Sequence, residues 1–196
     1  MVVEFVQRVG GHPARFAILA GSFNPPTIAH FELLRAAGAE VDETVCVLPT
    51  AFPHKDYSGA TLEQRLSMLR QLPCSIATTQ QGLLIDIARE CQAFYGDSTA
   101  VSLLCGADAA ERILNWDYGR AGVVDELLEE FELLVAPRGS VYQPAPGHIH
   151  RIRPLQIEGG FHDVSSTEVR ARIRRGEAWE HLVPEPIVDL VREIYS

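Results

Sequence analysis

Two segments of this sequence contain residues whose types and spacing suit chemistry at a phosphate. The first is GSFNPPTIAH, residues 21 to 30, which follows a short apolar run. Small residues such as Gly21 and Ser22 let the backbone approach a ligand closely, and the N–H groups at a helix start favour anions. Thr27 and His30 are three residues apart, so on a helix both side chains can reach one phosphate. The segment therefore predicts a phosphate-binding helix start.

The second segment is VSSTEVR, residues 164 to 170. Its S-x-x-E spacing from Ser165 to Glu168 is a capping box, which explains these residues without any ligand. A cap and a phosphate clamp are nevertheless compatible at one helix start. Because the first segment is also present, we favour a capped helix start that also binds phosphate.

Together the two segments resemble the signatures of the nucleotidylyltransferase superfamily. The first is similar to GxFxPxHxGH in its T-x-x-H variant, with Ala29 in place of the last glycine, and the matching residues are Gly21, Phe23, Pro25, Thr27 and His30. The second is similar to ISSTxxR, whose members close over the phosphates of a nucleotide, and the matching residues are Ser165, Ser166, Thr167 and Arg170. The resemblance implies that Gly21, Ser22 and Phe23 also bind the nucleotide.

Three further stretches resemble nicotinamide and nicotinate mononucleotide adenylyltransferases in particular. PHK at residues 53 to 55 and RLSML at 65 to 69 are similar to their P-x-K and R-L-x-M-L elements, and the ending from Leu182 extends the resemblance. LLCGADAAERILNW, residues 103 to 116, resembles their strand, G-A-D and downstream tryptophan. Lys55 would then act at phosphate, Gly106 and Asp108 would bind nucleotide, and Trp116 would stack on a flat ring. A solvated lysine, a helix cap at Asp108 and ordinary tryptophan packing remain alternatives.

The resemblance fails at the acceptor side. The bacterial enzymes carry S-Y-T-x-D-T-L there, whereas this chain has QGLLIDI at residues 81 to 87. Only Asp86 is recognisable, and the eukaryotic S-x-W-E equivalent is absent too. Asp86 and Trp116 are the expected substrate-binding residues, but the acid or amide form of the acceptor stays open.

The activity implied by the resemblance is transfer of AMP from ATP to a nicotinate or nicotinamide mononucleotide, with release of pyrophosphate and Mg²⁺ accompanying ATP. Attack by an ionised phosphate needs positioning and charge neutralisation, for which the expected catalytic residues are His30, Thr27, Lys55 and Arg170. Three alternatives stay open: a phosphopantetheine adenylyltransferase, a cytidylyltransferase, and a nucleotide-binding regulatory module without turnover.

Composition limits the other classes of function. A chain of 196 residues with 46% hydrophobic content can form one domain, residues 1 to 196, with a small helical part at about 164 to 196. The net charge of −9 argues against nucleic-acid and acidic-membrane partners, although arginines gather late, at Arg151, Arg153, Arg170, Arg172, Arg174 and Arg175. Small-molecule substrates are the expected partners, and a homo-oligomer is compatible with the sequence.

Cysteine and histidine usage favours a cytoplasmic protein without its own metal site. The four cysteines form no C-x-x-C pair, and His148, His150 and His162 lack ligand spacing. No apolar run is long enough to span a membrane, and we see no signal peptide.

Short apolar runs alternating with helical periodicity predict an α/β fold, a Rossmann-like open parallel sheet with helices on both faces. The expected strands are residues 15–20, 44–48, 100–105, 131–136 and 150–156. The expected helices are residues 27–38, 62–71, 82–94, 107–114, 123–129, 166–175 and 186–195, with a surface loop at 137–148. In such a sheet, ligands bind beyond the carboxyl ends of the strands where strand order reverses, which places residues 21 to 27 at the site.

Overall fold

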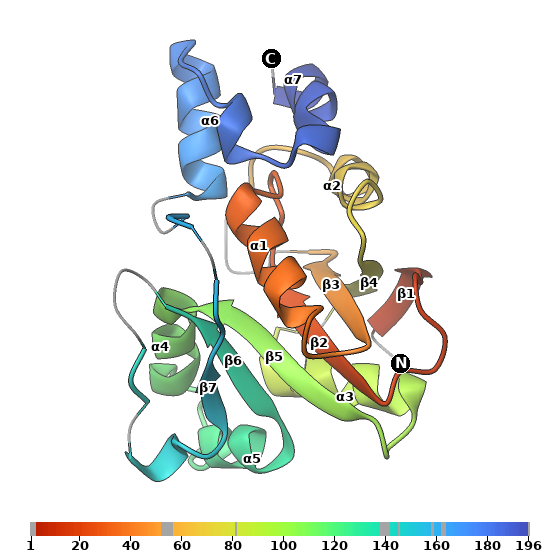
Figure 1. Ribbon diagram of the computed structural model, residues 1–196, viewed down its shortest axis with the longest axis vertical. Helices are drawn as coiled ribbons and strands as arrows, with labels where there is room; N and C mark the ends of the chain where they lie inside the picture. Colours follow the sequence, from red (N-terminus) through yellow and green to blue (C-terminus); the bar gives the residue numbers. More distant parts are fainter. Residues whose placement is uncertain are drawn as a thin grey trace.

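A seven-stranded sheet forms the centre of the protein, in a computed structural model that describes residues 3–51, 57–80, 82–137, 142–144, 146–157, 159–161 and 164–195. The strand order is β1-β4-β3-β2-β5-β6-β7 (Figure 1). The strands are β1 (Val3–Gln7), β2 (Arg15–Ala20), β3 (Glu43–Pro49), β4 (Ser75–Thr79), β5 (Ala100–Gly106), β6 (Glu132–Ala136) and β7 (Ile152–Pro154). All neighbouring strands run parallel except β1, which pairs antiparallel with β4.

Most helices connect parallel strands, and the last two follow β7. They are α1 (Ile28–Ala37), α2 (Leu62–Leu69), α3 (Leu84–Tyr95), α4 (Ala107–Asn115), α5 (Val123–Glu130), α6 (Ser166–Arg175) and α7 (Val188–Tyr195). Single 3₁₀ turns lie at η1 (Pro146–His148), η2 (Glu180–Leu182) and η3 (Glu185–Ile187). The predicted α/β architecture, with its helices on both faces of the sheet, is confirmed.

The core has two layers because the central strands are apolar on both faces, as strands of a covered parallel sheet must be. In β2, Ala17 and Leu19 pack with residues of α1, α2, α6 and α7. Phe16 and Ile18, on the other face, pack with residues of α3, α4 and α5. The side chains of one strand therefore hold both helical layers in place.

The order of the sheet reverses between β2 and β5. The chain moves from β2 outward to β3 and β4, then returns to β5 on the opposite side of β2 and continues to β6 and β7. A crevice opens beyond the carboxyl ends of two such neighbouring strands. The β2–α1 and β5–α4 connections, which carry the predicted site residues, both lie there.

Two strands were not expected from the sequence, and they change the nature of the sheet. β4 has the sequence SIATT, and all five residues are buried although three are polar. β1 alternates exposed with buried or half-buried residues and pairs with β4 as an antiparallel edge strand. The predicted open parallel sheet therefore also carries one antiparallel strand at this edge. Strand β7 is also shorter than the predicted 150–156.

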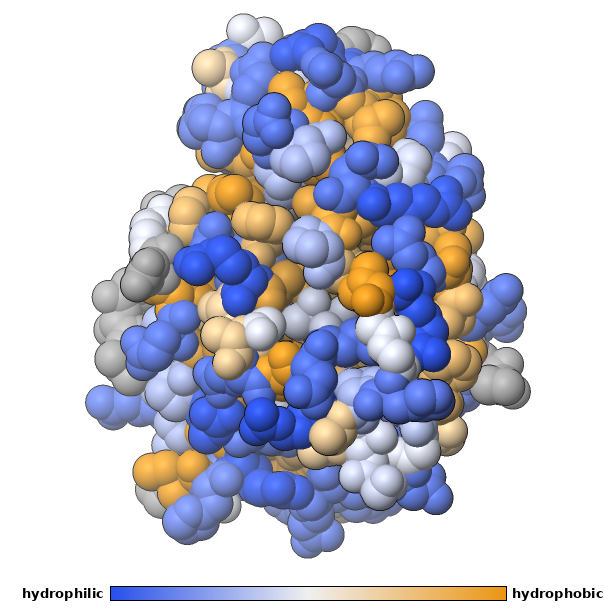
Figure 2. All heavy atoms as spheres, turned by 45° about the vertical axis from the view of Figure 1, so that its right-hand side comes forward, coloured by the Kyte–Doolittle hydropathy of each residue, from blue (hydrophilic) through white to orange (hydrophobic). Residues whose placement is uncertain are grey.

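The C-terminal helices share the core of the α1 side. Val169 of α6 and Val191 of α7 are buried in the same cluster as Leu34 and Leu66. Figure 1 shows α6 above the start of α1 and α7 next to α2. On the face shown in Figure 2, hydrophilic side chains surround several small hydrophobic groups. Among the helices of the described residues, none has the length and apolar character needed to cross a lipid bilayer.

Candidate active site

The loop between β2 and α1 fixes the ring of His30. Thr27 is the residue before α1, and its backbone N–H donates to His30 Nδ1 at 3.0 Å. The Thr27 hydroxyl lies 2.7 Å from the same nitrogen. Because an N–H can only donate, Nδ1 acts as the acceptor, and the neutral ring has its proton on Nε2. Nε2–H is then the one ring donor left to meet a ligand.

His30 is a neutral donor near neutral pH. Burial lowers the pKa of its imidazole from 6.5 to about 4, because a cationic ring loses hydration in the half-buried site. The ring also lies 5.2 Å, centroid to centroid, from that of Phe23. The side chain therefore offers a directed N–H rather than a full positive charge.

The side chains of Thr27 and Phe23 are both buried. The hydroxyl of Thr27 lies on Nδ1 of His30, so this residue orients the histidine. Phe23 is 1% exposed and lies in the core. A Cβ on Gly21 would lie 3.3 Å from the Phe23 ring, which explains a residue without a side chain there.

A buried arginine holds this loop to its neighbour. Arg65 of α2 is 2% exposed, and its guanidinium donates to the carbonyl of Ser22 at 3.1 Å and to that of Pro49 at 3.4 Å. Ser22 lies just after β2, and Pro49 is the last residue of β3. The arginine thereby fixes the relative positions of two loops at the carboxyl ends of neighbouring strands.

The two sequence segments meet. Ser166 Oγ donates to the carbonyl of Pro25 at 2.7 Å, and the Arg170 guanidinium donates to the carbonyls of Asn24 and Ser166. Ser165 caps α6 by accepting from the N–H of Glu168 at 3.1 Å, so the predicted cap is confirmed. Thr167 lies exposed in the first turn of α6.

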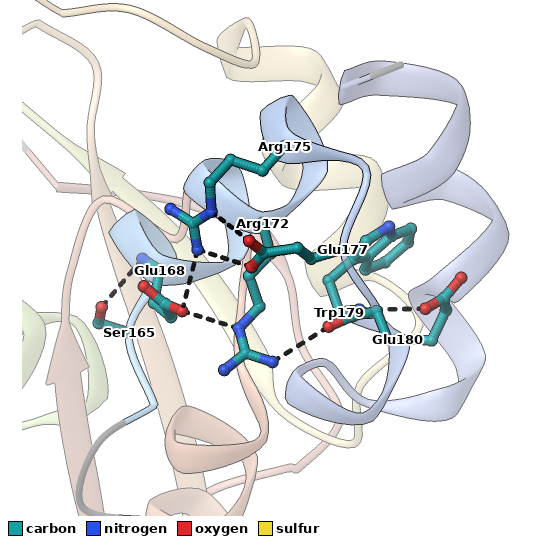
Figure 3. A network of polar contacts seen from close by, with 8 residues as sticks. Ser165, Glu168, Arg172, Arg175, Glu177, Trp179 and Glu180 are labelled. Carbon is teal, nitrogen blue, oxygen red and sulfur yellow. Dashed lines mark hydrogen bonds and ion pairs between the residues drawn. The ribbon is translucent and has the colours of Figure 1, made fainter.

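Other arginines of α6 are engaged with carboxylates, as Figure 3 shows. Glu168 accepts from Arg172 at 2.7 Å, and Glu177 accepts from Arg175 at 2.7 and 2.8 Å. Arg172 also donates to the carbonyl of Ala178. Arg172 and Arg175 therefore brace the end of α6, whereas Arg170 is directed to the β2–α1 loop.

A first cavity, of about 300 Å³, lies between α1, α4 and the start of α6. Its walls include the predicted residues Gly106, Asp108 and Ser165, together with Ala29, Pro137 and Phe161. Gly106 ends β5 and precedes α4. The cavity thus occupies the crevice beyond the strand ends, and its size suits a small ligand.

A second cavity, of about 350 Å³, adjoins the first. It is bounded by the segment 82–84, by Ile87 and Cys105, and by Trp116 and Tyr118 after α4. Trp116 is 64% exposed, so a face of the indole is accessible. The two cavities share Ala109 and Arg112 of α4 as a common wall.

Not every expected residue reaches these cavities. His30 and Arg170 are not among the residues that line either cavity, although the loop and helix that carry them meet. Asp86 lies in the first turn of α3 and interacts electrostatically with Arg89 and Arg120, away from the cavity walls. Lys55 lies outside the described residues.

No metal site built from protein side chains emerges in the described parts of the chain. Groups of three or more His, Cys, Asp and Glu suited to one ion are absent there. The four cysteines are free and buried.

Sequence reasoning missed Arg112, the charged residue of the common wall. No carboxylate of the described residues is paired with it, and it is exposed. Its position four residues after Asp108, about one helical turn away, could have revealed it, because both then share a face of α4. The resemblance drew attention to Asp108 and Trp116 instead.

Known proteins similar to this chain were found at low sequence identity over nearly the full length. A probable nicotinate-nucleotide adenylyltransferase of Exiguobacterium sibiricum is 27% identical over 194 residues, covering 91% of this chain and 96% of that protein. A protein of the same name from Stenotrophomonas maltophilia is 26% identical, covering 87% and 91%.

The fold is also similar to a solved structure and to a family model. Plasmodium falciparum nicotinic acid mononucleotide adenylyltransferase complexed with NaAD matches with a TM-score of 0.70 at 16% identity, covering 91% of this chain and 95% of that one. A family model described as cytidylyltransferase-like matches residues 18–172. This match spans both segments and both cavities, and the chain belongs to the cytidylyltransferase-like family.

Proposed function

We propose that this protein is an adenylyltransferase that transfers AMP from ATP to nicotinate mononucleotide, or to the nicotinamide form, and releases pyrophosphate in the synthesis of NAD. The observation that carries the proposal is the pair of adjoining cavities at the point where strand order reverses, with the two phosphate segments at their edge. Two substrates that react with each other need two neighbouring sites. The names of the similar proteins support this choice of reaction.

The first cavity is assigned to ATP. Its walls combine backbone that admits close approach at Gly106 with the carboxylate of Asp108, which can accept hydrogen bonds from ribose hydroxyls. Ser165 brings the start of α6 to the same cavity, and Ala29 is adjacent to His30. The N-termini of α1 and α6 would therefore face the phosphates.

The second cavity is assigned to the mononucleotide. The indole of Trp116 offers a stacking surface for a pyridine ring, and residues 82 to 84 supply backbone groups at its edge. Arg112 carries the positive charge between the cavities. A guanidinium there can pair with a phosphate or with the carboxylate of nicotinate, which favours the acid over the amide.

The reaction needs no protein base and no covalent intermediate. A phosphate oxygen of the mononucleotide, already ionised, attacks the α-phosphorus of ATP, and the bond to the pyrophosphate oxygen breaks as the new P–O bond forms. The contribution of the chain is to align the two phosphates and to stabilise the charge that develops on the transferred group. His30 would donate from Nε2, while Thr27 keeps the ring oriented.

Arg170 and Lys55 complete the proposed phosphate environment. Arg170 contacts the carbonyl of Asn24 on the phosphate loop itself, so a guanidinium is available at the entrance to α1. Mg²⁺ enters as part of the substrate MgATP. We assign the reaction to the cytoplasm, in keeping with four free, buried thiols.

A pyrophosphate-release panel tests the function. ATP is combined in turn with nicotinate mononucleotide, nicotinamide mononucleotide and phosphopantetheine, CTP replaces ATP in a parallel series, and the dinucleotide product is identified by mass spectrometry. Turnover with ATP and a pyridine mononucleotide is the expected result. Turnover only with phosphopantetheine or only with CTP would assign a different transferase, and ATP binding without turnover would identify a regulatory module.

A further inference from the structure

The side chain of Asn24, in the β2–α1 loop, forms hydrogen bonds with three residues of other segments. It is 3% exposed. Its amide Nδ2 donates to the carbonyl of Ser58 at 2.9 Å, and its Oδ1 accepts from the N–H of Ala60 at 3.1 Å. The hydroxyl of Tyr195, in the last turn of α7, donates to the same Oδ1. A single buried amide thus uses both its donor and its acceptor on other segments.

The backbone of Asn24 joins a third element. Its carbonyl accepts from the guanidinium of Arg170 in α6, next to the contact of Ser166 with Pro25. Segment 57–60, α6 and α7 are therefore all tied to one residue. In the sequence they are 34 to 171 positions away from it.

The segment that meets the amide is shaped around it. Gly59 has φ +123°, and a Cβ there would lie 2.5 Å from both Nδ2 and Oδ1 of Asn24. Only a glycine can adopt this backbone so close to the side chain. Tyr57 closes the turn by donating from its hydroxyl to the carbonyl of Ala60 at 2.7 Å. Ser58 is three residues after Lys55 in the sequence.

We propose that Asn24 is a positioning residue whose side chain sets segment 57–60 and α7 in register with the β2–α1 loop, an inference that rests on the proposed function. Asn24 touches no reacting atom. Its side-chain amide holds segment 57–60 and α7 against the loop that precedes α1 and His30, while its backbone carbonyl accepts from Arg170 of α6. Displacement of a catalytic group by about 1 Å can lower a rate by about 10²-fold, so small shifts of these segments would change turnover.

The decisive variants are Asn24→Asp and Asn24→Ala. Aspartate keeps the size and the acceptor but cannot donate to Ser58, and alanine removes both functions. We expect kcat to fall by about 10- to 100-fold for Asn24→Asp and further for Asn24→Ala. We expect the KM for ATP to change less than about threefold, because the cavity walls do not include Asn24. The ATP-binding stoichiometry, measured by calorimetry, should stay at its wild-type value. A partly unfolded variant would instead show a lower stoichiometry.

Tyr195→Phe and Asn115→Asp complete the series. Tyr195→Phe removes only the hydroxyl that meets Oδ1, should lower kcat about two- to fivefold, and serves if either Asn24 variant fails to fold. Asn115 is the other asparagine of the chain, and it donates to the carbonyl of Glu111 within α4 on the exposed surface. Its conversion to aspartate is the matched control and should leave kcat at the wild-type value.

Hydrogen exchange separates this inference from the proposed function. Peptides covering residues 57–61 and 188–195 should exchange faster in Asn24→Ala than in wild type or Asn115→Asp, whatever reaction the protein performs. If the wild type shows no transfer in the panel, the proposed function fails while these rates still report on the register. Wild-type kcat together with wild-type exchange in Asn24→Asp and Tyr195→Phe would overturn the positioning role.

Discussion

The two cavities differ in how their walls are built. The first is lined by residues of the stretches that resemble the family motifs, such as Gly106, Asp108 and Ser165. The second is bounded on one side by residues 82–84 and Ile87, where the resemblance fails, with Leu83 and Trp116 at its exposed edge, and apolar residues line both cavities. Phosphate recognition needs fixed geometry at helix starts, which restricts residue types strongly. A flat ring can be held by many combinations of apolar side chains, so the acceptor side can change while the phosphate side does not.

The largest expected effect breaks the phosphate side. His30→Ala should lower kcat by about 10²- to 10³-fold, because one directed donor to the developing charge is lost. Circular dichroism and the melting temperature should stay close to wild type. His12, an exposed histidine before β2, gives the control His12→Ala with unchanged turnover. An unaltered rate in His30→Ala would remove the residue from the mechanism.

The next effect tests the shared wall. Arg112→Gln should raise the KM for nicotinate mononucleotide by about 10- to 100-fold, and less for the nicotinamide form, because a charge-assisted hydrogen bond contributes about 1.5–3 kcal/mol. Steady-state kinetics with both acceptors measures the ratio. Arg174 of α6 is also exposed, and Arg174→Gln should change neither constant. Equal losses on both acceptors would place Arg112 at the phosphates instead.

A smaller effect sharpens the acceptor side. Trp116→Ala should raise the KM for the mononucleotide by about 2- to 10-fold, since an aromatic contact contributes about 0.5–1.5 kcal/mol. Trp116→Phe keeps a ring and should recover most of the loss. The KM for ATP should stay unchanged in both variants. A shift in the ATP constant alone would assign the second cavity to the other substrate.

The smallest effect concerns pH and stability. The pKa of His30 falls from 6.5 to about 4 on folding, so between these values the unfolded chain binds more protons. The free energy of unfolding of the wild type should therefore decrease on acidification from pH 6.5 towards 4, by at most ~1.4 kcal/mol per pH unit. His30→Gln lacks this proton uptake. Urea unfolding at pH 7 and 4.5 should show a larger loss for the wild type, and parallel losses would mean that the ring is solvated.

The parts of the fold that could be predicted depend on local sequence patterns, and the parts that could not depend on contacts between residues far apart in the sequence. The strands β2, β3, β5 and β6 were predicted because their apolar runs carry their own signal. β4 was missed because Ser75, Thr78 and Thr79 are polar yet buried. The segment SIATT forms a strand because it pairs with the distant strands β1 and β3. β1 is a strand because it pairs with β4, and no local sequence pattern predicts that pairing.

The site divides in the same way. The meeting of the two segments was anticipated and is seen in the bond from Ser166 to Pro25. The contact of the Thr27 hydroxyl with His30 was not predicted, because the side chain of a threonine three residues before a histidine can point towards a ligand or towards the histidine. The roles of Asn24 and Arg112 depend on contacts across more than 30 residues or on the shape of a cavity. Spacing within a motif carries neither kind of information.

The small side chain of Ala109, with Arg112 beside it, has a practical consequence for inhibitor chemistry. Since both cavities border on these two residues, a single compound carrying an adenosine at one end and an aromatic acid at the other is a design that would engage both. Its linker would have to pass over α4. Changes that alter acceptor choice are better made at Leu83, Leu84 or Trp116, which border only one of the two spaces.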